Sequence, residues 1–173
     1  MVTKKKLFWT IALLLGLALV IVLRPSHQAP STVSKSVEHV AIRASNRYDL
    51  EHDEVRGGHT LQRHIGKSDK ELRERLENES ISTDSTYADR ATAEMAVAAA
   101  ISENKEKIDR WLHRPGGHSN LVLDYDSNVP LGRSMRRDDT QSFPCSHAVA
   151  VLKWINPEEY YVLTSYPDCW KQR

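Results

Sequence analysis

The chain has 173 residues, of which 40% are hydrophobic and 27% charged, a globular composition that excludes a disordered or collagen-like protein. Its formal charge of +1 joins a basic first 30 residues, with four cations and no acid, to a remainder with 20 basic and 23 acidic residues. The mildly acidic remainder excludes a polybasic nucleic-acid binder, two cysteines exclude a disulfide-dense miniprotein, and one long apolar run excludes a multi-span membrane protein.

The first predicted element is the apolar segment 7–23, which has one polar residue, Thr10. Its length is at the short end of what crosses a bilayer, and the three lysines before it predict that the rest of the chain is translocated. A cleaved signal peptide has the same layout, but residues 24–30 offer no clean small-residue cleavage site. We favour residues 1–24 as a single-pass anchor that places the C-terminal domain outside the cytoplasm, whereas cleavage would give a secreted protein. A buried core helix is disfavoured because the segment is apolar on every face.

Residues 25–47 are rich in Ser, Thr, Pro, Gln and Ala, which predicts a flexible tether before a folded domain over 48–173. The segment 48–68 is expected to be irregular because Gly57 and Gly58 interrupt it. Ser68 and Glu71 have the spacing of a capping box and predict a helix over 69–79.

Two further helices are predicted next along the chain. The segment 89–103 is rich in alanine, the best helix former, and its buried face is expected to hold Met95, Val97, Ala98 and Ile101. A second segment begins after Asn104 and ends before residues 115–117. It places Ile108, Trp111 and Leu112 on one face.

The hydrophobic period changes from 3.6 to 2 after residue 120. Strands are predicted over 121–125, 129–136, 148–154 and 160–166, and the short connection 155–159 joins the last two into a hairpin. Helices followed by strands predict an α+β fold with an antiparallel sheet.

The two cysteines flank the predicted hairpin. A turn centred between residues 157 and 158 pairs residues whose numbers sum to 315, and Cys145 and Cys169 sum to 314. They are therefore expected to lie nearly opposite each other beyond the open end of the hairpin, close enough for a disulfide. A translocated domain would meet a compartment that permits oxidation. We favour a disulfide over two unrelated thiols.

The densest group of chemically capable residues lies between Gly57 and Asp69, on a loop that leads into the capped helix. It holds His59, Arg63, His64 and Lys67, and Arg75 follows on the helix. Each residue could also be an ordinary surface side chain, and Arg75 could simply pair with Glu71 or Glu79. The histidine spacing does not match a zincin helix, and two cysteines cannot form a cysteine-rich zinc site, so no metal or other cofactor is expected.

The segment 57–69 resembles the opening motif of the bacterial RNase A-like toxin domain, which is found at the C-terminal end of contact-dependent inhibition proteins and other polymorphic toxins. The resemblance covers about residues 50–168. It continues through Leu72, Arg75, Leu76, the alanine-rich helix, Ile108, Trp111, Leu112, residues 131–133 and the closing segment 161–167. It implies an RNase A-like fold with early helices packed on a curved antiparallel sheet, metal-independent cleavage of RNA, and an immunity protein as a further partner.

The resemblance also implies a catalytic set: a histidine in the opening motif, an arginine on the next helix, and a threonine and a tyrosine two apart in the last strand. These match His64, Arg75, Thr164 and Tyr166, with His59 as a second candidate. Independently of the family, strand alternation places Thr164 and Tyr166 on the same face.

The chemistry fits these residue types because RNA carries its own nucleophile, the 2′-hydroxyl. His64 would take the hydroxyl proton, and Arg75 would stabilise the charge that develops on phosphorus oxygens. His59 or Tyr166 would serve the leaving 5′-oxygen, and Thr164 would donate to a phosphate oxygen. The expected product is a 2′,3′-cyclic phosphate, and DNA should resist.

Substrate affinity should depend on a local patch of cations, since the domain is acidic overall. Arg63 and Lys67 are the predicted substrate-binding residues. The wider patch would comprise Arg63, Lys67, Arg73, Arg75, Arg133, Arg136 and Arg137. The first hypothesis is therefore an anchored or exported ribonuclease. The alternative is a non-catalytic envelope module that uses the same fold to bind protein, and a weaker third reading is a metal-dependent hydrolase.

Overall fold

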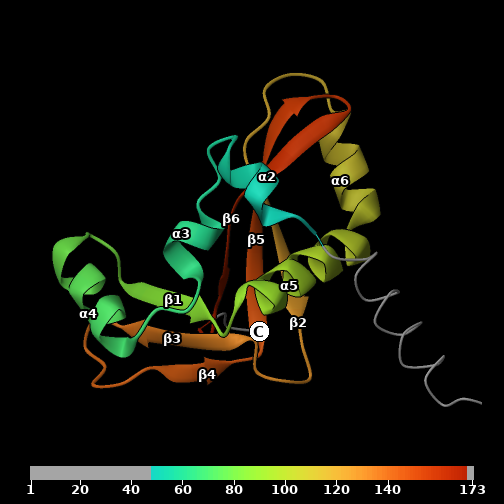
Figure 1. Cartoon of the computed structure of the whole chain (residues 1–173). Coiled ribbons are helices and arrows are strands. Elements are labelled where there is room, and N and C mark those ends of the chain that lie inside the picture. Colours follow the sequence, from blue (N-terminus) through green and yellow to red (C-terminus); the bar gives the residue numbers. More distant parts are fainter. Residues whose placement is uncertain (1–47, 171–173) are drawn as a thin grey trace, which may run out of the picture. The chain divides into compact units, whose positions relative to one another are not determined.

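The computed structural model describes residues 48–170. Their helices are α2 (Leu50–Glu54), α3 (Thr60–His64), α4 (Asp69–Asn78), α5 (Arg90–Glu103) and α6 (Lys105–Leu112) (Figure 1). Their strands are β1 (Thr83–Tyr87), β2 (Leu121–Asp126), β3 (Gly132–Arg136), β4 (Phe143–Cys145), β5 (His147–Asn156) and β6 (Glu159–Pro167). No helix within 48–170 is long and apolar enough to cross a bilayer. The predicted anchor over 1–24 and tether over 25–47 lie outside the described residues.

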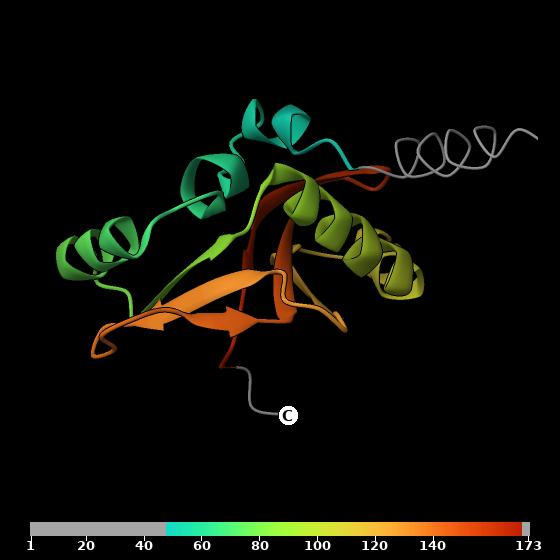
Figure 2. The ribbon, with the colours of Figure 1, turned by 60° about the horizontal axis from the view of Figure 1, so that its bottom comes forward.

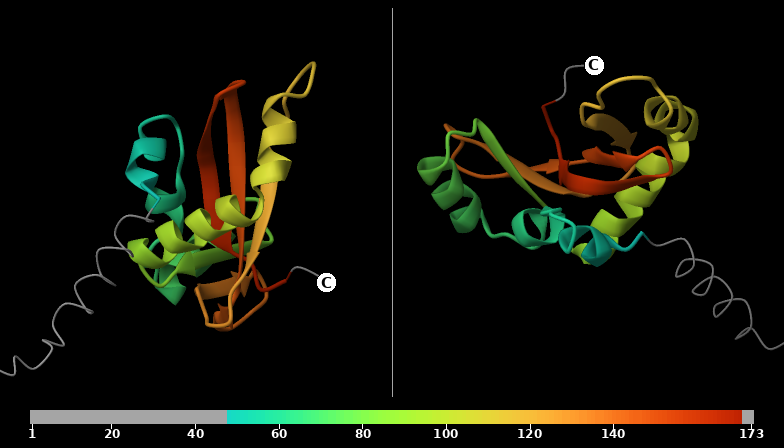
Figure 3. Two further views of the ribbon diagram at one scale, coloured as in Figure 1. Left: turned by 90° about the vertical axis from the view of Figure 1, so that its right-hand side faces the viewer. Right: turned by 90° about the horizontal axis from the view of Figure 1, so that it is seen from above.

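The strands pair into two antiparallel sheets, in the orders β1-β3-β4 and β2-β5-β6. This confirms the α+β class, but within the described residues the strands form two sheets where one curved sheet was expected. The chain changes sheet at Ser146, the one residue between β4 and β5. Helices α2, α3 and α5 gather on one side of the strands (Figures 2 and 3).

The main core forms between α5 and the β2-β5-β6 sheet. Small residues of the helix, Ala93, Ala96, Val97 and Ala100, are buried together with Leu123, Ala150, Leu152 and Val162 of the strands. Met95 was expected on the buried face but is 42% exposed. The buried stripe instead follows the alanines, because small side chains let the helix lie close to the sheet. Ala98 and Ile101 are half-buried, while Ile108 and Trp111 of α6 are buried as predicted.

The predicted capping box begins α4. The Ser68 hydroxyl accepts a hydrogen bond from the Glu71 amide at 3.3 Å, and the Glu71 carboxylate accepts one from the Ser68 amide at 2.8 Å. These two bonds satisfy amides that would otherwise lack partners at the helix start. The helix that carries Arg75 is therefore specified locally.

The prediction of an irregular segment over 48–68 is wrong, because this segment contains α2 and α3. Each has only five residues, too few to produce a visible hydrophobic period, and a carboxylate accepts a backbone amide at the start of each: the N-cap residue itself in α2, and a residue farther back along the chain in α3. Asp49 accepts from the Glu51 amide at 3.1 Å, and Glu54 accepts from the Leu61 amide at 2.9 Å.

Strands β1 and β4 were not predicted, and the strand expected over 129–136 begins only at Gly132. The sequence of β1 reads as a polar loop, although Asp84, Ser85, Thr86 and Tyr87 are all buried. Their burial comes from pairing with β3, which is a tertiary effect that local composition does not reveal.

The β5–β6 hairpin has the predicted register near its open end, where Val149 pairs with Tyr166 and Val151 with Thr164. A bulge between Val151 and Leu152 shifts the pairing by one residue closer to the turn. A disulfide joins Cys145 to Cys169, with Cα atoms 4.9 Å apart. It connects β4 of one sheet to the segment that follows β6 of the other.

Candidate active site

A cavity of about 450 Å³ is lined by residues from both sheets and from the helices beside them. All five predicted catalytic residues line it: His59, His64, Arg75, Thr164 and Tyr166. Segments roughly 100 residues apart along the chain therefore meet at one place. Further lining comes from β1 and β3, through Asp84, Ser85 and Ser134.

His64 is the last residue of α3 and is only 8% exposed. Its Nδ1 lies 2.8 Å from the carbonyl oxygen of Ser85. Because a carbonyl only accepts, this contact assigns the ring proton to Nδ1 and leaves Nε2 with a lone pair. Burial lowers the pKa of His64 to about 4, and the nearby Arg75 charge acts in the same direction. The imidazole is therefore neutral at pH 7, in the form that accepts a proton.

His59 precedes α3 and is half-buried. Burial is the main cause that lowers its pKa, and the charge of Arg63 adds to it. Both histidines of the cavity are thus neutral at neutral pH, so neither supplies an imidazolium as a proton donor.

Arg75 is held by two carboxylates. Its Nη1 donates to Asp84 Oδ1 at 2.6 Å, and its Nε donates to Glu79 Oε1 at 3.1 Å. The pairing with Glu79 that the sequence allowed is present, but the second partner turns the guanidinium toward the buried wall of the cavity. Arg75 Nη2 has no protein partner among the described residues and remains available to a ligand.

Asp84 is a site residue that the sequence reasoning missed. It is 4% exposed, and its Oδ1 also accepts the Ser85 amide at 2.9 Å. Burial raises the pKa of this carboxyl, while the Arg75 guanidinium opposes that rise. No motif marks Asp84, since its position depends on the unpredicted strand β1.

Thr164 and Tyr166 both face the cavity from β6, as strand alternation predicted. Ser165 between them is buried on the opposite face, where its hydroxyl donates to the Val149 carbonyl at 2.8 Å. The Tyr166 ring lies 5.5 Å from the His64 ring, measured between centroids. Burial raises the pKa of Tyr166, so its hydroxyl keeps its proton at neutral pH. Thr164 Oγ1 is buried and has no hydrogen-bond partner within 48–170.

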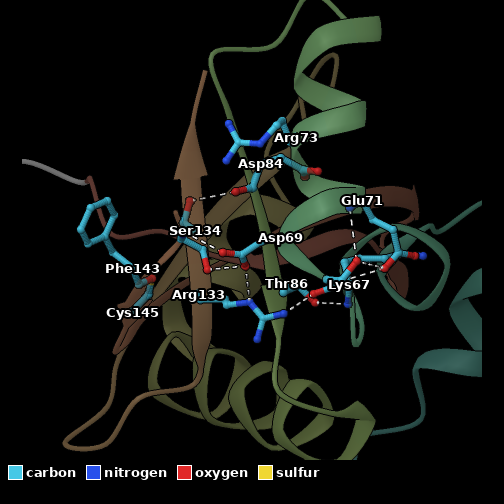
Figure 4. A network of polar contacts seen from close by, with 12 residues as sticks. Lys67, Asp69, Glu71, Arg73, Asp84, Thr86, Arg133, Ser134, Phe143 and Cys145 are labelled. Atoms are coloured by element: carbon cyan, nitrogen blue, oxygen red, sulfur yellow. Dashed lines mark hydrogen bonds and ion pairs between the residues drawn. The ribbon is translucent and has the colours of Figure 1, made fainter. Parts of the chain in front are cut away.

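The predicted substrate-binding residues Arg63 and Lys67 do not line the cavity. Arg63 is exposed on α3, directly before His64. The Lys67 amide donates to Thr86 Oγ1 at 3.0 Å, and its carbonyl accepts from Arg133, which also pairs with Asp69 (Figure 4). These main-chain contacts hold the loop before α4 in place.

Two further members of the predicted cationic patch, Arg73 and Arg137, bind backbone carbonyls. Arg73 donates to the carbonyls of Asp139 and Thr140 at 3.1 and 2.7 Å. Arg137 donates to those of Glu79 and Ile81, both at 2.7 Å. Arg136 lies over the ring of Trp170, 3.4 Å from its centroid.

Comparison with known proteins shows which family the chain resembles. The family described as the bacterial CdiA-CT RNAse A domain matches residues 58–167, which include all five predicted catalytic residues. A chain in the crystal structure of the CdiA-CT/CdiI complex from Y. kristensenii 33638 is 34% identical to this one, with a TM-score of 0.59. The match covers 64% of this chain and 99% of that chain. No curated protein matches. The chain belongs to the bacterial CdiA-CT RNAse A domain family, and the resemblance read from its sequence is confirmed.

Proposed function

We propose that this domain is an endoribonuclease that cleaves RNA without a metal, by attack of the 2′-hydroxyl on the adjacent phosphorus. Its membership of a ribonuclease toxin family supports the class of activity. The observation that carries the finer proposal is the convergence of His64, Arg75, Thr164 and Tyr166 on one cavity.

His64 is proposed as the general base. Its Nε2 accepts the 2′-hydroxyl proton as the bond from O2′ to phosphorus forms and the bond from phosphorus to O5′ breaks. The Ser85 carbonyl fixes the ring through Nδ1, and this hydrogen bond strengthens as the ring becomes positive. The low pKa keeps the base unprotonated before each turnover.

Arg75 and Thr164 are proposed to stabilise the charge on the non-bridging phosphate oxygens. Asp84 and Glu79 hold the Arg75 guanidinium through Nη1 and Nε, so Nη2 is the nitrogen free to donate. The unpartnered Thr164 hydroxyl supplies a second donor. Donors fixed before the reaction stabilise developing charge without the cost of reorganising solvent.

Tyr166 is proposed to serve the leaving 5′-oxygen. Both histidines are neutral, and a neutral imidazole is a weak proton donor. The Tyr166 hydroxyl retains its proton and lies on the same strand face as Thr164. It therefore transfers its proton to O5′ as the bond from phosphorus to O5′ breaks, and the phenolate is reprotonated through solvent by the proton that His64 took from the 2′-hydroxyl. His59, the second candidate for this role, also lines the cavity, but its neutral ring is the weaker donor.

The test is cleavage of single-stranded RNA by the purified protein in EDTA. His64→Ala and Tyr166→Phe are each expected to abolish cleavage, and full activity of the His64→Ala protein would overturn the assignment. A folded wild-type protein that cuts no RNA would favour the alternative of a protein-binding module. Inhibition of the wild type by EDTA would favour a metal-dependent hydrolase.

A protein partner is proposed as well. The similar solved structure is a CdiA-CT/CdiI complex, and by extension we propose that this domain is bound by an immunity protein. Loss of cleavage on addition of such a protein, with recovery on its removal, is the expected behaviour.

For the whole chain, residues 7–23 are proposed to anchor the protein in a membrane, with the domain outside the cytoplasm, or to direct its secretion if cleaved. The basic residues before this segment support that orientation. Protease added to intact cells should digest the domain of the full chain and spare that of a variant without residues 1–24.

A further inference from the structure

Within residues 48–170, strand β6 lies at the edge of its sheet, whose order is β2-β5-β6. Edge strands leave backbone groups unpaired unless another segment covers them. Here the segment before α3 does so. The His59 amide donates to the Leu163 carbonyl at 3.0 Å, and the Ser165 amide donates to Thr60 Oγ1 at 2.8 Å. The two bonds flank Thr164 on either side, and together we name them the β6 clamp.

The clamp is tightly packed. Thr60 and Ser165 are each 1% exposed, so the Ser165 amide has no access to water as a substitute acceptor. A Cβ added to Gly58 would lie 2.8 Å from the Val162 carbonyl oxygen and 2.9 Å from that of Asp53. The opening motif therefore needs glycine at 58 because the chain passes so close to β6.

The opposite end of α3 is fixed by β1. His64 Nδ1 bonds to the Ser85 carbonyl, and the Gly66 amide donates to the Tyr87 carbonyl at 3.3 Å. A helix of five residues has little stability of its own. Its position thus depends on these two attachments, with β1 holding the end that carries His64 and β6 holding the start.

We propose that Thr60 is a positioning residue, whose hydroxyl holds α3 on β6 so that His64 keeps its place opposite Thr164 and Tyr166. The kinetic part of this inference rests on the proposed ribonuclease function. Thr60 itself does not line the cavity. It acts through the Ser165 amide, which lies between the two cavity-facing residues of the strand.

The test compares Thr60→Val, which keeps the shape but removes the acceptor, with Thr60→Ser, which keeps the acceptor. In the Val variant kcat should fall about 10- to 100-fold with little change in KM, since a displacement of about 1 Å at a catalytic group costs that much. The Ser variant should recover to within about threefold of wild type. Wild-type kcat in a folded Thr60→Val protein, or a Ser variant as slow as the Val variant, would overturn the inference.

Tyr87→Phe is the matched control. The Tyr87 hydroxyl donates to Ser165 Oγ at 2.6 Å, so this change also removes a buried hydrogen bond to residue 165, but from the side chain and behind the strand. It should lower the melting temperature and leave kcat near wild type. An equal loss of kcat in Tyr87→Phe would mean that removing any buried hydrogen bond to Ser165 slows the reaction. The specific role assigned to Thr60 would then fail.

A readout independent of activity separates this inference from the proposed function. NMR titration should place the pKa of His64 near 4 in the wild type and higher, toward 6.5, in Thr60→Val, because a displaced α3 exposes the ring. If the wild type cuts no RNA, the proposed function fails, and this titration still decides the clamp. An unchanged His64 titration in the Val variant would overturn it. Should Thr60→Val not fold, Thr60→Ala leaves room for water at the Ser165 amide and serves for the same measurements.

Discussion

Arginines have different partners in two regions of this domain. In the cavity, Arg75 is held by the carboxylates of Asp84 and Glu79 and keeps one nitrogen free. On the side formed by α4, β3 and the segment after it, Arg73 and Arg137 donate to backbone carbonyls far along the chain. The sequence alone predicted that all three arginines belong to one cationic patch that binds phosphates. The comparison shows that an arginine's role depends on what its guanidinium contacts, and that carbonyl-bound arginines support the fold.

The largest expected effect comes from replacing one arginine of each kind with glutamine and comparing the two variants. Arg75→Gln should lower kcat/KM about 100- to 1,000-fold, the usual loss when one donor to a developing oxyanion is removed. Arg73→Gln, the matched change on the same helix, should leave kcat/KM within about threefold of wild type and lower the melting temperature instead. Steady-state kinetics and thermal unfolding of both variants check this. A comparable kinetic loss in both would erase the distinction.

The disulfide is expected to act like the carbonyl-bound arginines: it should stabilise the fold and have little effect on the reaction. Reduction of the disulfide between Cys145 and Cys169, which are 24 positions apart in the sequence, should lower the free energy of unfolding by about 3 kcal/mol. Because neither cysteine lines the candidate active-site cavity, kcat should change little at temperatures where the reduced protein stays folded. Denaturant unfolding with and without a dithiol reductant measures the first effect, and a kinetic assay of the reduced protein measures the second.

The pH dependence sharpens the role of His64. Burial lowers its pKa from 6.5 to about 4, so the acidic limb of the kcat/KM profile should lie near pH 4. Between these two values the unfolded state binds a proton that the folded state does not, so stability should fall as pH drops from 6.5 toward 4. His64→Gln should weaken that fall in stability. An acidic limb of the kcat/KM profile near pH 6.5 would contradict the proposal that buried His64 is the general base.

The smallest effects are expected at Arg63 and Lys67, which lie near the cavity without lining it. Arg63→Gln and Lys67→Gln should each raise KM about two- to threefold at low salt and less at high salt, as expected for screened contacts with phosphates. Measuring KM at several salt concentrations checks this. Arg137→Gln, which changes an arginine bound to backbone carbonyls, is the control. A loss of kcat in either variant would move that residue into the catalytic set.

Local signals in the sequence predicted the elements that depend on neighbours along the chain. The capping box predicted the helix that begins after Ser68, and the centre of the last turn predicted the sum of 315 that paired residues of β5 and β6 have near the open end of the hairpin. The helix over 89–103 was found through its alanines, although its buried face was misread at Met95. The catalytic candidates came from the family motif, and the structure adds that they share a cavity.

What could not be predicted depends on contacts between distant segments. Strand β1 is polar and becomes a strand by pairing with β3, so Asp84 went unnoticed. Helix α3 is too short to show a period and is positioned by β1 and β6. The partners of Arg73 and Arg137 lie more than 50 residues away, which is why composition alone suggested a phosphate-binding patch.

The central claim is that this cavity uses the 2′-hydroxyl of RNA as the nucleophile. The most direct measurement compares an RNA oligonucleotide with the same oligonucleotide carrying a single 2′-deoxy residue at the cleaved position, in EDTA, with the products identified by mass spectrometry. The account predicts a 2′,3′-cyclic phosphate from the RNA and no cleavage at the deoxy position. Cleavage at the deoxy position, or a product that never passes through the cyclic phosphate, would contradict it.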